Sequence, residues 1–546
     1  MSAVPAIRAL AFCALTPLAA CAVNNEPPPR NEGASRAATH VAFFDTVDNP
    51  EDDPGSERES RAMRYAADYF QGLGLQTMVQ TVPLVRMIPI TATVTLSGPG
   101  GVVTEVSPSS RFIMWAGKQA ERVTLDTGIV FAGYGIVSPE YHRDDYKGAD
   151  LTGKIVVVLE GTPRTGTRSN LGTLGETYYG TRQYKFEEAA RRGAAGVLIV
   201  HDEQEEPWAE MQRQATGSIV DIDSSTLQHP QPKADIEGWL SPDTARELLE
   251  MAGKNLPQFR HQAHEAAFEP VELPGVRATV RMDSRLEKLT SQDVIAVLPG
   301  RHPEHVLLAG RWNRIDPDAW ASRSFAEAEA GTASSFAAPP DTEMVSHLND
   351  DGSGAAVVME AARRLVEARE RPLRSVVFMV GTALKPGLLG LEYYVEHPAI
   401  RGSRVDALIV MDRADLTGAS QRLGKIGTAS DTALSQLTRG AAIEQGRLVE
   451  LDENPHRRFY YKFGQAALAR HGVRMIALTS TPEEDGASRH LRHIASRDRV
   501  VGFTDAGAHS FVPNPRQDSA LLTALVRRVA NATNWPPHHE PAGPAR

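Results

Sequence analysis

Residues 374–398, RSVVFMVGTALKPGLLGLEYYVEHP, contain the pattern that decides the fold. The apolar run over 374–383 predicts a buried strand, and the segment after the glycines predicts a helix. The same alternation recurs along the chain, with strands expected at 293–300, 305–310, 405–412 and 472–480 and helices at 57–73, 354–368, 463–472 and 517–532. This order indicates an α/β domain with a mixed, largely parallel sheet covered by helices. In such sheets the functional site lies at the carboxyl ends of the strands.

Length and charge limit the possible functions. A chain of 546 residues is too long for one compact core, so we expect more than one domain. The net charge of −10 provides no basic surface, and nucleic acid is therefore not an expected partner. No run of residues is long and apolar enough to predict a membrane-spanning helix.

The N-terminus has the pattern of a bacterial lipoprotein signal. A short apolar run over 9–20 ends in Leu18-Ala19-Ala20-Cys21, which resembles a lipobox. In that interpretation residues 1–20 are removed, Cys21 carries the lipid anchor, and the protein faces the periplasm from the bacterial cell envelope. Ala22 favours the outer membrane by analogy with such lipoproteins. The alternative is an ordinary signal peptide followed by a chance cysteine.

A second kind of pattern occupies residues 120–240. VFAGYGIVSPEYHRDDYKGADLTGKIVVVLEGTP, followed by EEAARRGAAGVLIVHD, predicts short strands with one helix between them. These residues resemble a protease-associated (PA) domain, a non-catalytic β-rich module inserted in peptidases. The expected division is a tether over 21–40, an α/β domain over 41–115 and 285–535, the PA-like insert over 116–284, and a disordered tail over 536–546.

Four segments at strand ends carry the second resemblance: AGRWNRI at 309–315, LNDDGSGAA at 348–356, TALKPGLLG at 382–390 and IVMD at 409–412. In this order they resemble the di-zinc exopeptidases of peptidase family M28, which include aminopeptidases and carboxypeptidases. The resemblance implies an exopeptidase-like fold over the α/β domain, with the PA-like module inserted in it.

The resemblance also implies a pair of Zn²⁺ ions held by five side chains. In this family one carboxylate bridges both ions, and a glutamate takes a proton from the bound water. Carried onto this sequence, Asp350 matches the bridging carboxylate and Asp412 matches a strand-end ligand. The late histidine ligand matches His493, with His490 and His509 as alternatives.

The other family positions are substituted. Arg311 stands where the first ligand histidine is expected, and Asn313 stands where an aspartate would orient that histidine. Leu384 occupies the general-base position, and Lys385 occupies that of the glutamate ligand. Each ion would keep two protein ligands where a catalytic zinc has three, and arginine cannot be deprotonated. We therefore expect no zinc pair and little peptidase activity.

The substituted cations suggest what replaces the metal. Two buried carboxylates without an ion would be costly, so we expect Arg311 and Lys385 to pair with Asp412 and Asp350. The expected function is that of a lipid-anchored pseudopeptidase without a cofactor, which binds a peptide or a protein partner in the old cleft. The role of the PA-like module stays open.

Two other functions remain possible on the sequence. One is an active zinc-dependent aminopeptidase with residual or non-standard ligands, for which the expected loop over 316–342 offers Asp316, Asp318 and Glu327. The other is a hydrolase that uses Ser353. The sequence DGSGA lacks the G-x-S-x-G motif of a serine nucleophile, so a structural serine at the start of a helix is the favoured interpretation.

Overall fold

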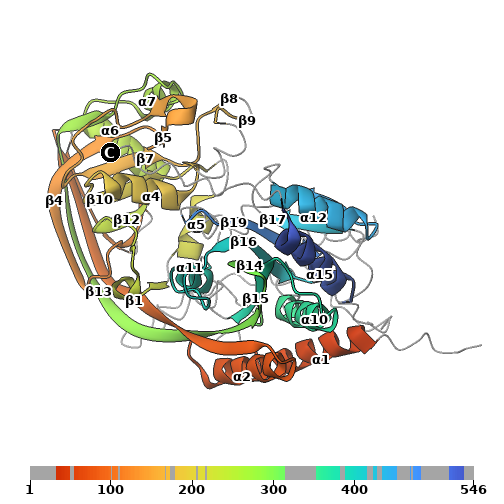
Figure 1. The fold of residues 1–546 in the computed structure, drawn as a ribbon. Coiled ribbons are helices and arrows are strands. Elements are labelled where there is room, and N and C mark those ends of the chain that lie inside the picture. Colours follow the sequence, from red (N-terminus) through yellow and green to blue (C-terminus); the bar gives the residue numbers. More distant parts are fainter. Residues whose placement is uncertain are drawn as a thin grey trace, which may run out of the picture.

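The computed structural model of the chain describes residues 32–48, 54–99, 101–107, 111–165, 168–171, 179–203, 207–215, 218–313, 352–381, 388–414, 422–426, 433–451, 468, 471–480 and 516–533. These residues form two lobes joined by one continuous sheet (Figure 1). The strand order is β18-β17-β19-β16-β14-β15-β13-β4-β7-β10-β12-β3. Strand β1 lies outside this linear order and pairs with β2, β11 and β13.

The first lobe has the α/β architecture that the sequence predicts. Its strands are β13 (Val271–Leu298), β14 (His302–Arg311), β15 (Arg374–Gly381), β16 (Val405–Arg413), β17 (Arg422–Ile426), β18 (Leu448–Leu451) and β19 (Arg474–Ser480). Its helices are α1 (Glu32–Val47), α2 (Glu57–Gly72), α10 (Ser353–Glu367), α11 (Leu389–Glu396), α12 (Ala433–Ile443) and α15 (Arg516–Asn531). Strands β15, β14, β16 and β19 are parallel, whereas β13 and β17 join them antiparallel. The mixed, largely parallel sheet is therefore confirmed.

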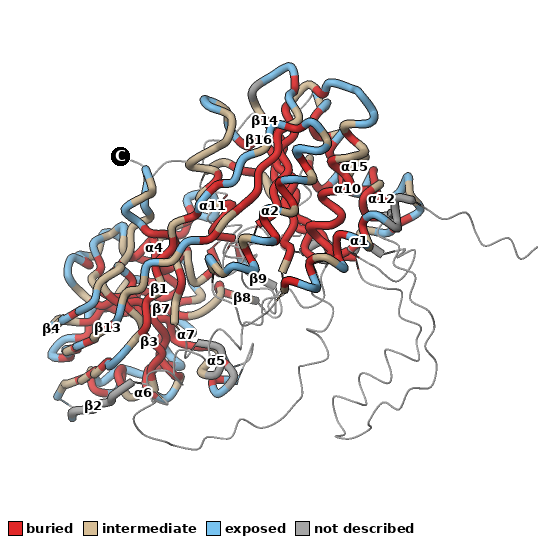
Figure 2. The backbone as a smooth tube through the Cα atoms, turned by 90° about the horizontal axis from the view of Figure 1, so that it is seen from below, coloured by how far each residue is buried: buried red, intermediate tan, exposed pale blue. Residues whose placement is uncertain are grey.

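Helices cover both faces of this sheet. Helices α1, α2, α10, α12 and α15 pack on one face through a large apolar cluster. Helix α11 packs on the opposite face against a smaller cluster formed by the alternate residues of the same strands. Because both faces are covered, the strands are buried along their length (Figure 2).

The second lobe is the β-rich module. Its elements are β2 (Gly101–Ser107), β3 (Phe112–Ala116), β4 (Arg122–Phe131), β5 (Val137–Ser138), β6 (Arg143–Asp144), β7 (Ile155–Leu159), β8 (Arg164–Thr165), β9 (Arg168–Ser169), α4 (Arg182–Arg191), β10 (Gly196–Val200), α5 (Trp208–Ala215), β11 (Ile219–Ile222), β12 (Ile236–Leu240), α6 (Pro242–Met251) and α7 (Leu256–Ala263). Strands β4, β7, β10 and β12 form a parallel core, in agreement with the predicted strand–helix–strand order.

Two long strands connect the lobes. Strand β1 (Gln76–Gly98) pairs with β13 from Gln76 opposite Val297 to Ser97 opposite Arg277. This antiparallel ribbon runs from one lobe into the other (Figure 1). The domain boundary expected between residues 284 and 285 lies inside β13, so the chain enters and leaves the module through continuous strands rather than loops.

The tether expected over residues 21–40 is wrong in its last part. Helix α1 begins at Glu32, and its residues Ala37, Val41 and Phe44 are buried against α2, α10 and α15. These apolar residues recur every three to four positions, which gives the helix one face that packs on the lobe. Residues 1–31 and the tail over 536–546 lie outside the described residues, as do most of the helix expected at 463–472 and all of the loop over 316–342.

Candidate functional site at the strand ends

The candidate site lies where the central strands of the α/β lobe end. The register places Asp293 of β13 opposite Gly381 of β15, and Gly381 beside Arg311 of β14. In the next strand, Met411 of β16 is the partner of the residue before Arg311, which puts Asp412 level with Arg311. Alternate residues point to the same face of a sheet, so the row Asp293, Gly381, Arg311 and Asp412 faces the side covered by α11.

Arg311 and Asp412 form an ion pair in this row. The guanidinium Nη2 lies 3.8 Å from the carboxylate Oδ1, and the two side chains are only 6% and 3% exposed. Charges so deeply buried require a partner of opposite sign, because desolvation of an isolated charge is costly. The pair expected from the sequence between these two residues is therefore present.

Asn313 lies two residues beyond Arg311 and is half-buried. Its amide Oδ1 is buried and has no hydrogen-bond partner among the described residues. An amide carries no charge, so Asn313 cannot supply the carboxylate that would hold a ligand histidine in one orientation.

The N-terminus of α10 packs directly against these strand ends. Gly352 has a positive φ of 66°, and a Cβ at this position would lie 2.3 Å from the carbonyl oxygen of Trp312. A Cβ at Gly354 would lie 2.3 Å from the carbonyl oxygen of Met411, so only glycine fits at either place. The chain just before α10 therefore approaches the ends of β14 and β16.

Ser353 has a structural role in the same contact. Its Oγ accepts a hydrogen bond from the backbone N–H of Ala414 at 2.9 Å, and the residue is 1% exposed. This bond connects the start of α10 to the end of β16. The geometry favours the structural interpretation of Ser353 over that of a nucleophile.

Several predicted site residues lie outside the described residues. They are Cys21, Asp350, Leu384, Lys385, His490, His493 and His509, together with the loop acids Asp316, Asp318 and Glu327. Their assignments, including the pair between Lys385 and Asp350, stay predictions. Of the predicted positions, the structure describes Arg311, Asn313, Ser353 and Asp412, and it pairs Arg311 with Asp412.

One buried acid at the site was missed by the sequence analysis. Asp293 is fully buried, and its Oδ1 lies 1.8 Å from where a Cβ on Gly381 would be. Its carboxylate thus extends over the glycine, towards the strand that carries Arg311. The sequence did contain a signal for Asp293, since a charged residue stands at the first position of the expected buried strand 293–300.

The described strand ends include two of the ligand positions of the zinc pair that the family resemblance implies, those of Arg311 and Asp412. A permanent cation, Arg311, occupies a predicted ligand position and already contacts the carboxylate of Asp412. Within the described ranges, no three His, Cys, Asp or Glu side chains form a group able to hold a metal ion. A guanidinium beside Asp412 would repel a metal ion bound to the same carboxylate, because both carry positive charge.

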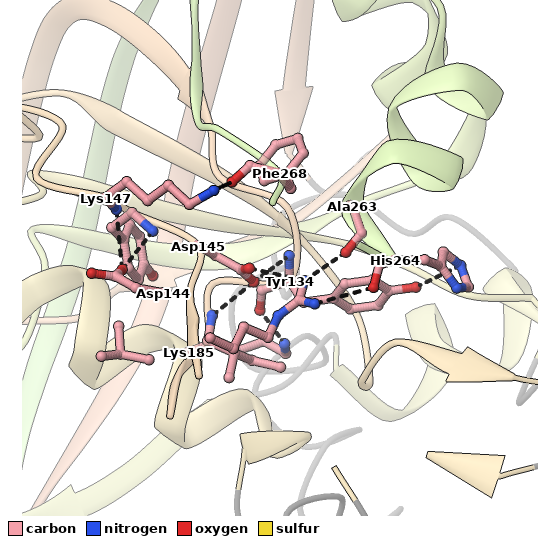
Figure 3. Close-up of polar contacts among 12 residues, drawn as sticks. Tyr134, Asp144, Asp145, Lys147, Lys185, Ala263, His264 and Phe268 are labelled. Atoms are coloured by element: carbon pink, nitrogen blue, oxygen red, sulfur yellow. Dashed lines mark hydrogen bonds and ion pairs between the residues drawn. The ribbon is translucent and has the colours of Figure 1, made fainter. Parts of the chain in front are cut away.

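A second buried polar cluster lies in the β-rich lobe (Figure 3). Arg143 Nη2 lies 2.8 Å from Asp145 Oδ1 and also donates to the carbonyl of Ala263 at the end of α7. Asp145 Oδ2 accepts from the backbone N–H of Tyr134, and the ammonium of Lys185 donates to the Tyr134 carbonyl. Burial lowers the pKa of Lys185 to about 7, although Asp145 opposes this shift. These bonds hold the loop after β4 in place.

The fold and the strand-end row define an exopeptidase-like α/β protein with a β-rich insert. Residues 293–497 match the family model of peptidase family M28, and residues 125–229 match that of the PA domain. Both resemblances that the sequence implied are therefore confirmed over these residues.

Solved structures similar to the chain include aminopeptidases. The aminopeptidase from Aneurinibacillus sp. strain AM-1 is 15% identical, with a TM-score of 0.44 and coverage of 92% of this chain and 96% of that one. The zinc aminopeptidase BSAP from Bacillus subtilis is 16% identical, with a TM-score of 0.37 and coverage of 91% and 95%. A peptidase M28 precursor from Shewanella amazonensis SB2B is 16% identical, with a TM-score of 0.37 and coverage of 92% and 96%. No curated protein matches the chain.

Proposed function

We propose that this M28 protein is a pseudopeptidase, which binds a peptide or a protein partner in the strand-end cleft without hydrolysing it. The observation that carries the proposal is the buried ion pair between Arg311 and Asp412, which sits where the family would hold a metal. Two sequence features support it. Leu384 cannot move a proton, and Lys385 adds a second cation at a ligand position.

Metal content tests this proposal directly. The full chain carrying Cys21→Ser would be dialysed against excess zinc, desalted and analysed for zinc per chain by mass spectrometry. We expect no stoichiometric zinc and no release of amino-terminal residues from peptides. About two zinc ions per chain, together with such release, would overturn the proposal and establish the alternative, an active aminopeptidase with non-standard ligands.

A matched variant sharpens this test. Arg311→His with Lys385→Glu removes both cations and restores two of the family's ligand types. If the cations replaced the metal, the double variant should bind zinc that the parent chain does not bind. Equal zinc content in both chains would show that these two residues do not decide metal binding.

We further propose that a lipid on Cys21 anchors the protein to the bacterial cell envelope, on the periplasmic face of the outer membrane. The support is the Leu18-Ala19-Ala20-Cys21 motif. In the described part of the chain, no helix has the length and apolar character needed to cross a membrane. Radiolabelled palmitate should be incorporated into the parent chain but not into Cys21→Ser. Equal incorporation in both chains would refute the anchor.

A further inference from the structure

The first part of strand β1 forms an outer edge of the α/β lobe. Over residues 76–82 it pairs with β13 on one side. On its other side, the pairing with β11 begins only at Leu84 and the pairing with β2 only at Ala92. Among the strands that the structure describes, none pairs with residues 76–82 on that side. This stretch is called the β1 edge below.

The contact with β11 shows which backbone groups point outward from the β1 edge. The carbonyl of Pro83 accepts a hydrogen bond of 3.0 Å from the backbone N–H of Asp223, so Pro83 points away from β13. The N–H and C=O of one strand residue point to the same side, and every second residue points the same way. The register with β13 is continuous over this stretch. Thr77, Val79 and Thr81 therefore direct their backbone N–H and C=O groups outward.

The chain closes both ends of this outward run. Before it, the N–H of Leu75 donates to the carbonyl of Phe70 at 3.2 Å, and Thr77 Oγ1 donates to the carbonyl of Leu75 at 3.1 Å. After it, Pro83 has no N–H, and its carbonyl is already bonded to Asp223. The outward groups that remain for another strand are therefore centred on Val79.

The side chains of the β1 edge are apolar or neutral. Met78 and Val79 are 43% and 46% exposed. Their partners in β13, Ile295 and Val294, belong to the apolar clusters on opposite faces of the sheet, so both faces of the edge expose an apolar side chain. No charged residue occurs between residues 73 and 85. Soluble proteins usually protect an edge strand with charges, because an uncharged edge pairs readily with another strand.

The β1 edge is complementary to itself in one antiparallel register. If Val79 lies opposite the same residue of a second copy, Thr77 lies opposite Thr81 and Met78 lies opposite Gln80. All outward residues of both copies then fall in hydrogen-bonded pairs. The directly opposed valines and threonines are favourable cross-strand pairs, and no like charges meet.

We propose that the β1 edge pairs antiparallel with the β1 edge of a second copy of this chain, so that the two sheets form one across a two-fold axis at Val79. A second copy is the occupant because the outward run ends symmetrically on both sides of Val79 and matches itself in that register. Such an interface uses the same surface on both subunits. The proposal goes beyond the pseudopeptidase function and does not depend on it.

This pairing has a consequence for the candidate site. Gln80 of the β1 edge is the partner of Asp293, and Asp293 is the partner of Gly381, so the strand-end row begins next to this edge. A two-fold axis perpendicular to the sheet keeps the same face of both copies on one side. The dimer therefore presents both candidate sites on one face of a continuous sheet.

Analytical ultracentrifugation of the full chain carrying Cys21→Ser, over a range of concentrations, tests the proposal. We expect a reversible dimer. Val79→Lys places two like charges opposite each other on the axis, and it should raise the dissociation constant by about tenfold or more. Ile90→Lys is the matched control, because Ile90 is a 58% exposed residue of the same strand outside the β1 edge, and it should leave the dimer unchanged. Urea unfolding should show that both lysine variants remain folded.

A disulfide tests the register. In the chain carrying Cys13→Ser and Cys21→Ser, Val79→Cys puts two thiols across the axis, with about 5.5 Å between their Cα atoms in a hydrogen-bonded pair. This separation suits a disulfide. Oxidation with diamide should therefore give a covalent dimer with Val79→Cys and leave Ile90→Cys largely monomeric.

The outcomes decide the inference separately from the proposed function, since none of them depends on metal content or peptide binding. A monomer at every concentration, with Val79→Cys not crosslinked, would overturn the proposal and leave the β1 edge to a strand of a different protein. A dimer that Val79→Lys does not weaken would place the interface elsewhere and would also overturn it.

Discussion

Arg311 places a permanent cation beside the buried carboxylate of Asp412. The guanidinium is part of the chain, so it cannot dissociate from the carboxylate as a bound ion can. We expect Arg311→Met to lower the free energy of unfolding by about 3 kcal/mol, because it leaves a buried charge without this cation. Urea unfolding measures the change.

The exposed pair between Arg122 and Asp283 provides the control for that prediction. Its atoms lie 2.8 Å apart, but the arginine side chain is 79% exposed. Solvent screens this exposed pair, so Arg122→Met should change the free energy of unfolding much less than Arg311→Met. Equal losses in the two variants would mean that the Arg311 pair has no special role.

Lys185 makes the stability of the β-rich lobe, which carries the PA-domain match and is called the PA lobe below, depend on pH. Burial lowers its pKa from 10.5 to about 7, with Asp145 and Glu160 opposing and Arg143 assisting the shift. Between these two values the unfolded chain binds a proton that the folded chain does not bind. The free energy of unfolding should therefore rise between pH 7 and 10.5, by at most about 1.4 kcal/mol per pH unit.

Lys185→Met should remove this contribution to the slope in urea unfolding. Lys147→Met is the matched control, because Lys147 also donates to a backbone carbonyl, that of Phe268, but is exposed. The prediction is wrong if the two variants keep the same pH dependence as the parent chain.

The sequence was sufficient to predict the pair of Arg311 and Asp412 but not the position of Asp293. The family resemblance assigns both residues to ligand positions of one ion at the carboxyl ends of strands, so they could be paired without coordinates. Asp293 lies in the last part of β13, which runs antiparallel to β15, and only the register with Gly381 brings it to the same edge. Register depends on tertiary packing, which a strand pattern alone does not contain.

At the scale of secondary-structure elements, helix α1 packs beside the strand ends of the candidate site. The ring of Phe44 lies 6.1 Å from that of Trp312, which follows Arg311, and its Cβ is within 3.1 Å of where a Cβ on Gly352 would be. Phe44→Ala should lower the free energy of unfolding by about 3–5 kcal/mol, because it leaves a cavity in the core. It should also speed hydrogen exchange of the backbone at 352–356.

Phe43 is the natural comparison for that variant. It is only half-buried and stacks on Tyr65 at a centroid distance of 3.8 Å, away from the strand ends. Phe43→Ala should cost less stability and leave exchange at 352–356 unchanged. An equal effect from both variants would show that α1 merely adds stability and has no specific contact with the site.

Elements with a clear hydrophobic period were predicted well, and those that depend on packing were not. Helices α2 and α10 and strands β14, β15 and β16 lie close to their expected ranges. Helix α1 was missed because a Pro-rich, polar start masks its apolar face at Ala37, Val41 and Phe44. The ribbon of β1 and β13, which extends beyond one domain, was not predicted either. A typical strand has about 5–6 residues, so a sequence pattern does not suggest strands of this length.

At the scale of the whole molecule, the described parts of the two lobes are joined by the ribbon of β1 and β13 and by contacts of α11 with β11 and Gln228. A ribbon of two strands can twist and bend, whereas the hydrogen bond from the backbone N–H of Gln228 to Glu396 fixes the distance between the lobes at α11. We therefore expect Glu396→Ala to broaden the inter-lobe distance distribution, because it removes a buried charge-assisted bond and leaves the ribbon intact. The PA lobe would then move as a body about the ribbon rather than unfold.

Spin labels can measure this motion, because the only two cysteines of the sequence are Cys13 and Cys21. Labels on Lys254→Cys in the PA lobe and Arg64→Cys on α2 would report one narrow distance distribution in the chain carrying Cys13→Ser and Cys21→Ser. Glu396→Ala should broaden it, and Glu444→Ala, a glutamate on the far side of the α/β lobe beyond α12, should not. If Glu396→Ala leaves the distribution narrow, the ribbon of β1 and β13 alone sets the spacing of the two lobes, and the contact of α11 with Gln228 only follows from it.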